Sequence, residues 1–532
     1  MAEIQLGIWP GAAVAKGFAL GASARSGSQS FAKPQINPAL NVQIVGSCHS
    51  RCVALRLPRP LTRSRLWCLW LAPWLLFSFA CRAEPSLVEQ ASEGPPLQDD
   101  TEAIKAAVDD LQQRIEQLEA TQFSSVTTLR GELSSVLGNL QTYGSVVDRA
   151  TNQALNQPLR NGVSFNYDLK LYVDTSFTGH DRLHIRLRSG NFQPSAFWFS
   201  EPTPLTRIQV GWESKPCSSG DPISCSRNLV MLNRAYYQFP ISEEWRATFG
   251  ARVLQVDLLP LFPSVYDDAK ILQLFQFAGA QGAYSRRLGP GLGLAWKPKG
   301  ALQGFSLGLA SIQNQGSVGD PDEGGVLGRQ SAQTNTVQLA YTRKRWNVTA
   351  TYTANGTPAR LRGTPLANTL TGDSTDGWVN SWGLAGYWQP VRSGWIPSVS
   401  AGVGFDALQF SQFSLPEVTT AQTSSWMVGL VWTDLLAPGN SLGMAVGSPN
   451  SVSLLKGKGI SGVDDSLLAA EAYYRIQLTD HIQLIPAIFW INRPRGAMTA
   501  TTSADQAVLQ PELNNAASLG VFGSILQLVV RF

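Results

Sequence analysis

The chain has 532 residues with 42 Lys and Arg against 38 Asp and Glu, and only 15% of its residues are charged. This charge content is low for a soluble enzyme, and no dense basic patch with interleaved aromatic residues indicates a nucleic-acid partner. The 16 Trp and 12 Tyr are residue types that collect at membrane interfaces. Because no run of 18 apolar residues follows position 84, a membrane-embedded form of this chain has to cross as strands.

Residues 1–83 are interpreted as an extended N-terminus that ends in a secretory signal peptide. They carry nine Lys and Arg and one acid, and five arginines precede the apolar run 66–80. A basic region, a short apolar core and the small residues Cys81 and Ala83 predict cleavage after Ala83. A buried helix and a lipoprotein-type cleavage before Cys81 are the alternatives. The length ahead of the apolar run leads to the hypothesis that translation begins nearer Val53 or Leu55.

Residues 84–99 form a polar linker, and residues 100–142 are predicted to be a periplasmic coiled-coil helix. Apolar residues recur at spacings of three and four, first at Ile104, Val108, Leu111, Ile115 and Leu118 and then, out of phase, at Val126, Leu129, Leu133, Val136 and Leu140. An amphipathic helix lying on its own domain is the alternative. The connector 143–162 contains Asn156, Gln157 and Pro158, which break the helical period.

Residues 163–177 alternate between apolar odd positions and polar even positions, as a strand with lipid on one side and water on the other would. We expect this stretch to be the first wall strand of a barrel. The even face presents Asp168, Lys170 and Asp174 to the lumen.

Sixteen strand-like segments, one of them 207–212, divide residues 163–532, separated by Gly, Pro, Asn, Asp and Ser. The predicted fold is an all-β transmembrane antiparallel barrel of about sixteen strands, a size that leaves an aqueous channel. The last strand alternates up to the terminal aromatic residue, and we interpret Leu526, Leu528, Val530 and Phe532 as its signal for barrel insertion.

The polar faces of the next strands suggest a basic lumen wall. The candidate pore-lining residues are Arg182, His184, Arg186, Arg188, Arg234, Arg246 and Arg252. If they face water, they predict a mild anion preference. The alternative is that Asp168, Asp174 and Glu213 balance them, or that they face loops.

Residues 256–282 lack alternation and are predicted to fold into the channel as a constriction, with Asp257, Tyr266, Asp267 and Asp268 lining it. An extracellular cap is the alternative. Cys217 and Cys225 predict a disulfide that closes a loop of an exported protein, with two free thiols or a metal pair as the alternative.

No catalytic motif is present: the four histidines have no metal-ligand spacing, and there is no P-loop or GxSxG sequence. We therefore expect no enzyme activity, no catalytic residue, no cofactor and no metal. A barrel hydrolase using His180 or His184 with a serine is the alternative.

Four stretches resemble the cyanobacterial outer-membrane porins related to the carbohydrate-selective porin OprB family: 232–253, 258–266, 275–287 and 526–532. The resemblance covers residues 100–532. It implies a homotrimeric channel, inserted by the barrel-assembly machinery into outer-membrane lipid of a Gram-negative cell of cyanobacterial type. Small hydrophilic solutes and inorganic ions would diffuse through it, with carbohydrates and iron as candidate cargo.

One departure from this family pattern concerns the cell wall. The S-layer homology domain usual between signal peptide and coiled coil is replaced by the linker 84–99, so contact with peptidoglycan is not implied. The rival function is a coiled-coil tether whose barrel serves only as a membrane anchor.

Overall fold

The computed structural model describes residues 108–114, 126–144, 147–148, 153–154, 162–193, 195–198, 203–213, 228–266, 271–320, 322–328, 330–359, 361–372, 374–392, 394–460, 462–501, 503–511 and 519–532. The expected signal peptide, its cleavage after Ala83, the linker, the Cys217 and Cys225 pair, and Asp267 and Asp268 lie outside these residues.

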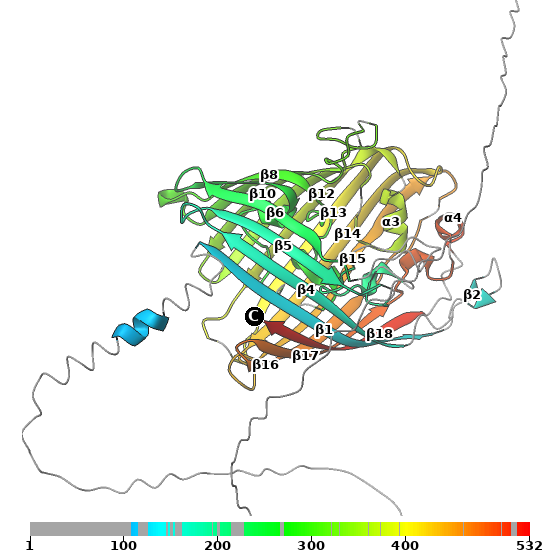
Figure 1. Cartoon of the computed structure of the whole chain (residues 1–532). Coiled ribbons are helices and arrows are strands. Elements are labelled where there is room, and N and C mark those ends of the chain that lie inside the picture. Colours follow the sequence, from blue (N-terminus) through cyan, green and yellow to red (C-terminus); the bar gives the residue numbers. More distant parts are fainter. Residues whose placement is uncertain are drawn as a thin grey trace, which may run out of the picture. The chain divides into compact units, whose positions relative to one another are not determined.

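Sixteen antiparallel strands of the described chain close into one barrel (Figure 1). They are β1 (Thr127–Tyr143), β4 (Val163–Thr175), β5 (Arg182–Gly190), β6 (Met231–Pro240), β7 (Trp245–Leu254), β8 (Leu288–Trp296), β9 (Phe305–Gln313), β10 (Gln333–Arg343), β11 (Trp346–Gly356), β12 (Thr375–Trp388), β13 (Ser398–Gln412), β14 (Val418–Thr433), β15 (Ser441–Gly457), β16 (Ala469–Thr479), β17 (Ile482–Asn492) and β18 (Gly520–Arg531). Each strand pairs with its neighbours in the chain, and β1 pairs with both β4 and β18 to close the ring.

Short elements complete the described fold. The strands β2 (Val147–Asp148) and β3 (Gln153–Ala154) form a separate ribbon, and the helices are α2 (Gln255–Leu258), α3 (Pro365–Gly372) and α4 (Ala504–Leu509). The 3-10 turns are η1 (Pro204–Thr206), η2 (Gln273–Gly279), η3 (Gly300–Leu302) and η4 (Gly496–Met498). No helix in the described part of the chain is long and apolar enough to cross a membrane.

The wall strands have one apolar and one polar face, as β11 illustrates. Val348 and Tyr352 are exposed on the outside, whereas Thr349, Thr351 and Thr353 are buried inside. Side chains alternate across a strand, so this pattern places apolar groups against lipid and hydroxyls toward the lumen.

The two ends of the barrel differ in the length of their connections. At one end two residues join β10 to β11, and the cross-strand pairs Trp245 with Trp296 and Trp346 with Trp388 lie beside these short turns. At the other end residues 191–230 and 255–287 form long connections. Outer-membrane barrels place short turns on the periplasmic side and aromatic girdles at both interfaces. The chain enters β1 and leaves β18 at the short-turn end.

Two sequence predictions about the start of the barrel in the chain are wrong. Residues 108–114 are helical, but Thr127–Tyr143 is the strand β1, so the predicted helix does not continue to residue 142. The stretch beginning at Val163 is consequently the second wall strand. Leu129, Leu133 and Leu137 are spaced four residues apart, so they share one face both of a strand and of a helix. Pairing with β18 and β4 makes this segment a strand rather than a helix.

The segment 207–212 is also not a wall strand. Its Ile208 forms an isolated β-bridge with Leu272. Ile208 lies in the connection between β5 and β6, and Leu272 lies in the connection between β7 and β8. The prediction of about sixteen strands is confirmed, although one predicted segment is wrong and β1 was missed.

Candidate functional site

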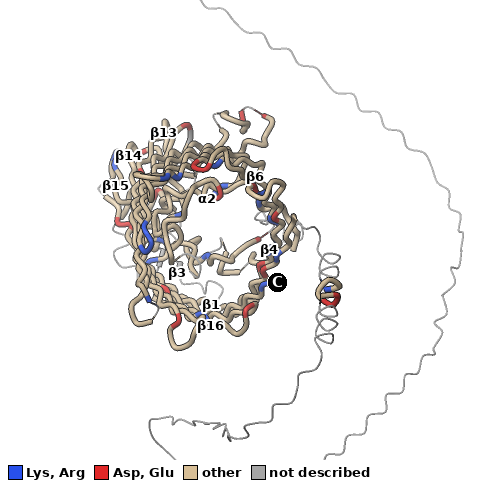
Figure 2. The backbone as a smooth tube through the Cα atoms, turned by 90° about the vertical axis from the view of Figure 1, so that its left-hand side faces the viewer, with Lys and Arg blue, Asp and Glu red and all other residues tan. Residues whose placement is uncertain are grey.

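Two loops meet inside the barrel, one from the β5–β6 connection and one from the β7–β8 connection. The amide of Gln209 donates to the carbonyl of Ile271 at 2.8 Å, and that of Gln273 donates to Arg207 at 2.9 Å. Figure 2 looks along the barrel and shows α2, at the start of the second loop, on the inner side of the wall. The two loops thus brace each other within the ring of strands.

Glycines on the wall allow the second loop to lie close to it. A Cβ added to Gly383 would be 2.8 Å from the Cβ of Ala280 and 2.9 Å from that of Ala283. A Cβ on Gly293 would be 2.7 Å from Leu258 Cβ, and one on Gly402 would be 2.4 Å from the carbonyl oxygen of Ala278. Close backbone approach of this kind needs residues without side chains.

Buried polar groups fasten the same loop to the wall. The side-chain amide of Gln255 donates to the carbonyl of Ala283 at 3.0 Å and to Thr353 Oγ1 at 3.1 Å. The hydroxyl of Tyr284 accepts from Gln338 Nε2 at 2.9 Å, and burial raises the pKa of Tyr284 to about 12. These contacts fix the loop along its length.

Glu471 of β16 holds the middle of the loop. Its carboxylate accepts the Tyr266 hydroxyl at 2.7 Å and the amides of Ile271 and Leu272 at 3.1 and 2.6 Å. The prediction that Tyr266 lines the pore is therefore wrong, because this side chain is only 1% exposed and packs against the wall at Gly429. Aromatic bulk fills the space that the missing side chain of Gly429 leaves.

The predicted polar face of β4 and β5 lies inside the barrel, where its charges pair with one another. Arg188 donates two hydrogen bonds to Asp168, at 2.6 and 2.8 Å, and stacks on Trp212 of the first inward loop. Lys170 lies 2.7 Å from Glu132 and 3.3 Å from Asp168. Asp168 is 0% exposed, so its carboxylate is buried within this set of paired charges.

Three more of the predicted arginines, and His184, also have partners. Arg182 and His184 each approach Asp174 Oδ1 at 2.7 Å. Arg234 lies 2.6 Å from Asp257, and Arg186 donates to Asn233 at 2.7 Å.

These contacts agree with the alternative in which acids balance the arginines. Asp168 and Asp174 serve that role, while Glu213 accepts the amide of Gln193 at 2.9 Å. Arg246 lies on the same face of β7 as the buried Thr248, two residues away. The side-chain amide of Gln238 on β6 donates a hydrogen bond to the hydroxyl of Thr248.

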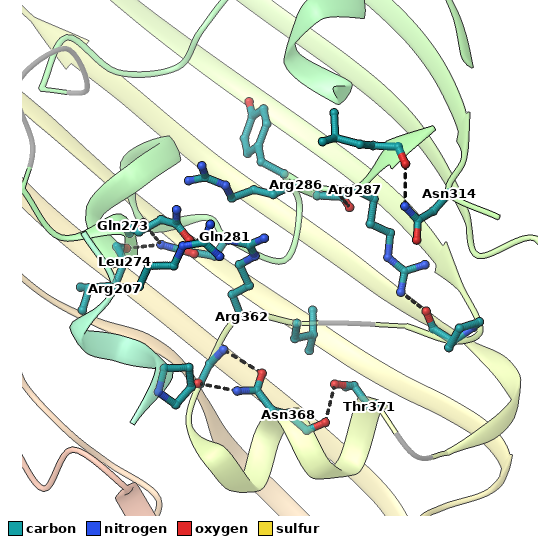
Figure 3. Close-up of a pocket in the computed structure, with 18 of the residues that line it drawn as sticks. Arg207, Gln273, Leu274, Gln281, Arg286, Arg287, Asn314, Arg362, Asn368 and Thr371 are labelled. Atoms are coloured by element: carbon teal, nitrogen blue, oxygen red, sulfur yellow. Dashed lines mark hydrogen bonds between the residues drawn. The ribbon is translucent and has the colours of Figure 1, made fainter. Parts of the chain in front are cut away.

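A further basic cluster, not among the predicted sites except for Arg252, surrounds a cavity of about 830 Å³ near the long-loop end (Figure 3). Its arginines are Arg207, Arg252, Arg286, Arg287 and Arg362. Arg287 donates to the carbonyls of Ala332 and Pro358, so it joins two long loops. Sequence spacing could not reveal this cluster, because its members come from the strand β7 and from three different connections.

The pKa of Arg207 is lowered by its burial and by the neighbouring positive charges of this cluster. Burial, together with the nearby guanidiniums of Arg362 and Arg286, holds the pKa of Arg207 well below its usual range. The guanidinium also lies 3.8 Å from the ring centroid of Trp198, a contact that favours a cation.

The family model of the carbohydrate-selective porins, OprB family, matches residues 100–522. The chain belongs to the OprB porin family. It is 27% identical over 423 residues to an uncharacterized protein of Synechocystis, covering 74% of this chain and 70% of that protein. An uncharacterized Nostoc protein is 25% identical over 432 residues, covering 76% and 68%. The high-pH structure of Pseudomonas putida OprB matches with a TM-score of 0.47 and 12% identity, covering 76% of this chain and 94% of that one.

Membership of this porin family, joined to the closed barrel, makes the protein an outer-membrane channel for small solutes. The two loops that meet through Arg207 and Gln273 lie inside this barrel (Figure 2). Lipid contacts its apolar outer face.

Proposed function

We propose that the protein allows passive diffusion of small hydrophilic solutes, including carbohydrates and inorganic ions, and catalyses no reaction. The observation that carries this is an inner surface of hydroxyl, amide and paired charged groups, narrowed by a loop that is fastened to the wall through Gln255 with Thr353 and through Glu471. Selectivity then comes from the width and charge of the narrowed lumen.

The test is single-channel recording of the purified full chain in planar bilayers, together with swelling of liposomes in sugars of increasing size. We expect stepwise ionic conductance and sugar entry that falls with solute size. A closed bilayer containing correctly folded protein contradicts the proposal and favours the tether function.

We also propose that the channel is a homotrimer whose helical segment lies in the periplasm. Val108 and Leu111, which belong to the predicted heptad seam, are 49% and 57% exposed on the helical residues 108–114. Two apolar side chains on one stripe favour burial against a second copy of the same helix.

Analytical ultracentrifugation in detergent tests the trimer, with Leu111→Asp as the variant and Asp109→Asn as a control in the same helix. We expect Leu111→Asp to lower the mass toward the monomer, and Asp109→Asn to keep the trimer. A monomeric wild-type chain contradicts the proposal.

A further inference from the structure

The cavity near the long-loop end has the chemistry of an anion site. We propose that Arg207, Arg286 and Arg362 bind a phosphate group, either inorganic phosphate or the phosphate of a phosphorylated sugar, as it enters the channel. This inference rests on the proposed function, since it assigns a class of solute to the same pore.

Hydrogen bonds to neutral groups help to position the three guanidiniums. Arg207 donates to the carbonyl of Gly211 at 3.2 Å, and Arg286 donates to the side-chain oxygen of Gln209 at 3.4 Å. Arg362 donates to the side-chain oxygen of Gln273. Because the amides of Gln209 and Gln273 form the backbone pairing of the two inward loops, that pairing helps to position all three arginine side chains.

Two buried hydrogen-bond donors of the cavity have no partner in the described part of the chain. These donors are Arg252 Nε and Gln273 Nε2. The described lining residues include no Asp or Glu. Buried donors without partners are costly, so the site favours a guest that supplies acceptors and negative charge.

Phosphate fits both requirements. It carries up to two negative charges and several acceptor oxygens, and the planar guanidinium forms paired hydrogen bonds with such oxygens. The cavity of about 830 Å³ is larger than one phosphate and lies within the range of pockets for small organic ligands. Figure 3 shows Arg207, Arg286 and Arg362 beside Gln273 and Gln281, and Asn314, another lining residue of the cavity, beyond Arg287.

The experiment measures chloride current through the full chain in planar bilayers while inorganic phosphate or glucose 6-phosphate is added on the long-loop side. We expect both to reduce the current at concentrations where glucose and acetate do not. Arg286→Gln and Arg362→Gln should each raise the half-blocking phosphate concentration roughly tenfold, the scale of one charge-assisted hydrogen bond. A lower half-blocking concentration for glucose 6-phosphate than for phosphate would identify the sugar ester as the guest.

Matched controls separate charge from damage to the fold. Arg392→Gln removes an arginine from the exposed turn between β12 and β13, at the opposite end of the barrel, and should leave the block unchanged. Arg286→Lys should retain part of the block, because it keeps the charge without the planar donor pair. Equal block in wild type, Arg286→Gln and Arg362→Gln overturns the inference.

A channel that conducts chloride but is insensitive to phosphate rejects the phosphate site and leaves the proposed function intact. If no current flows, calorimetric titration of phosphate into the folded protein in detergent decides the site independently. Binding that disappears in Arg362→Gln supports the site even then, whereas no binding to the wild type overturns it.

Discussion

Phe532 and Gly131 close the barrel as a cross-strand pair. The amide of Gly131 donates to the carbonyl of Phe532 at 2.6 Å, and that of Phe532 donates back at 3.1 Å. A Cβ on Gly131 would be 2.2 Å from the ring of Phe532, so the terminal ring covers the glycine. The last residue of the chain thus completes the contact between the last strand and the first.

Replacing Phe532 with Ala should lower the free energy of unfolding by about 0.5–1 kcal/mol, the scale of one cross-strand aromatic pair. Gly131→Val should destabilise by more in the wild-type background than in Phe532→Ala, because its side chain meets the ring. Urea unfolding in detergent micelles measures both, with Gly162→Val as a control at a glycine that has open space. Additive effects of the two substitutions would contradict the contact.

Glu471→Ala should loosen the inward loop. The substitution removes the acceptor of the Tyr266 hydroxyl and of the amides of Ile271 and Leu272, each a bond to a charged group worth about 1.5–3 kcal/mol. We expect noisier single-channel current and faster proteolysis within 255–287. Glu323→Ala, at an exposed carboxylate, should match the wild type. An unchanged cleavage rate in Glu471→Ala would argue against a role of these hydrogen bonds in holding the loop.

Arg188→Gln should destabilise the barrel by about 3–5 kcal/mol, because it leaves the buried carboxylate of Asp168 without its bidentate partner. The double variant Arg188→Gln with Asp168→Asn should recover much of that loss, since it removes both charges. Unfolding midpoints of the two single variants and the double variant test the coupling. The ion selectivity of the double variant should equal that of the wild type, because the pair is neutral as a unit.

Asp465 should make the long-loop end sensitive to pH. Its carboxylate accepts the amides of Val452 and Ala497, both at 2.8 Å, and the hydroxyl of Thr364, and burial raises its pKa to about 6. A carboxyl with a raised folded pKa stabilises the fold below the unfolded pKa near 4 and loses that stabilisation as pH rises through about 6. The nearby charges are those of Asp464 and Arg493, which pair with each other.

Urea unfolding of the wild type at pH 4 and pH 8 should therefore differ by up to about 3 kcal/mol from this residue, with the lower stability at pH 8. The variant Asp465→Asn should lose this part of the pH dependence. Asp434→Asn, in a short turn, is the control. If the contribution of Asp465 to the free energy of unfolding instead rises with pH, the expected direction of the pH dependence is wrong.

The sequence alone determined the barrel and its faces. Alternation is a property of neighbouring residues, so the strand at Val163, the last strand and the apolar outer face could be predicted without knowledge of any distant contact. The loss of that alternation marked residues 256–282 as a loop, but it left a channel constriction and an extracellular cap as alternatives.

The tertiary structure decided what depends on residues far apart in the chain. Pairing with β18 and β4 made Thr127–Tyr143 a strand although its leucines also fit a helical seam. Register across β4 and β5 set Arg188 against Asp168, so that charges expected to face water neutralise one another. The meeting of two inward loops gathered Arg207, Arg286 and Arg362 around one cavity, because loop placement follows close packing against wall glycines, which local spacing does not encode.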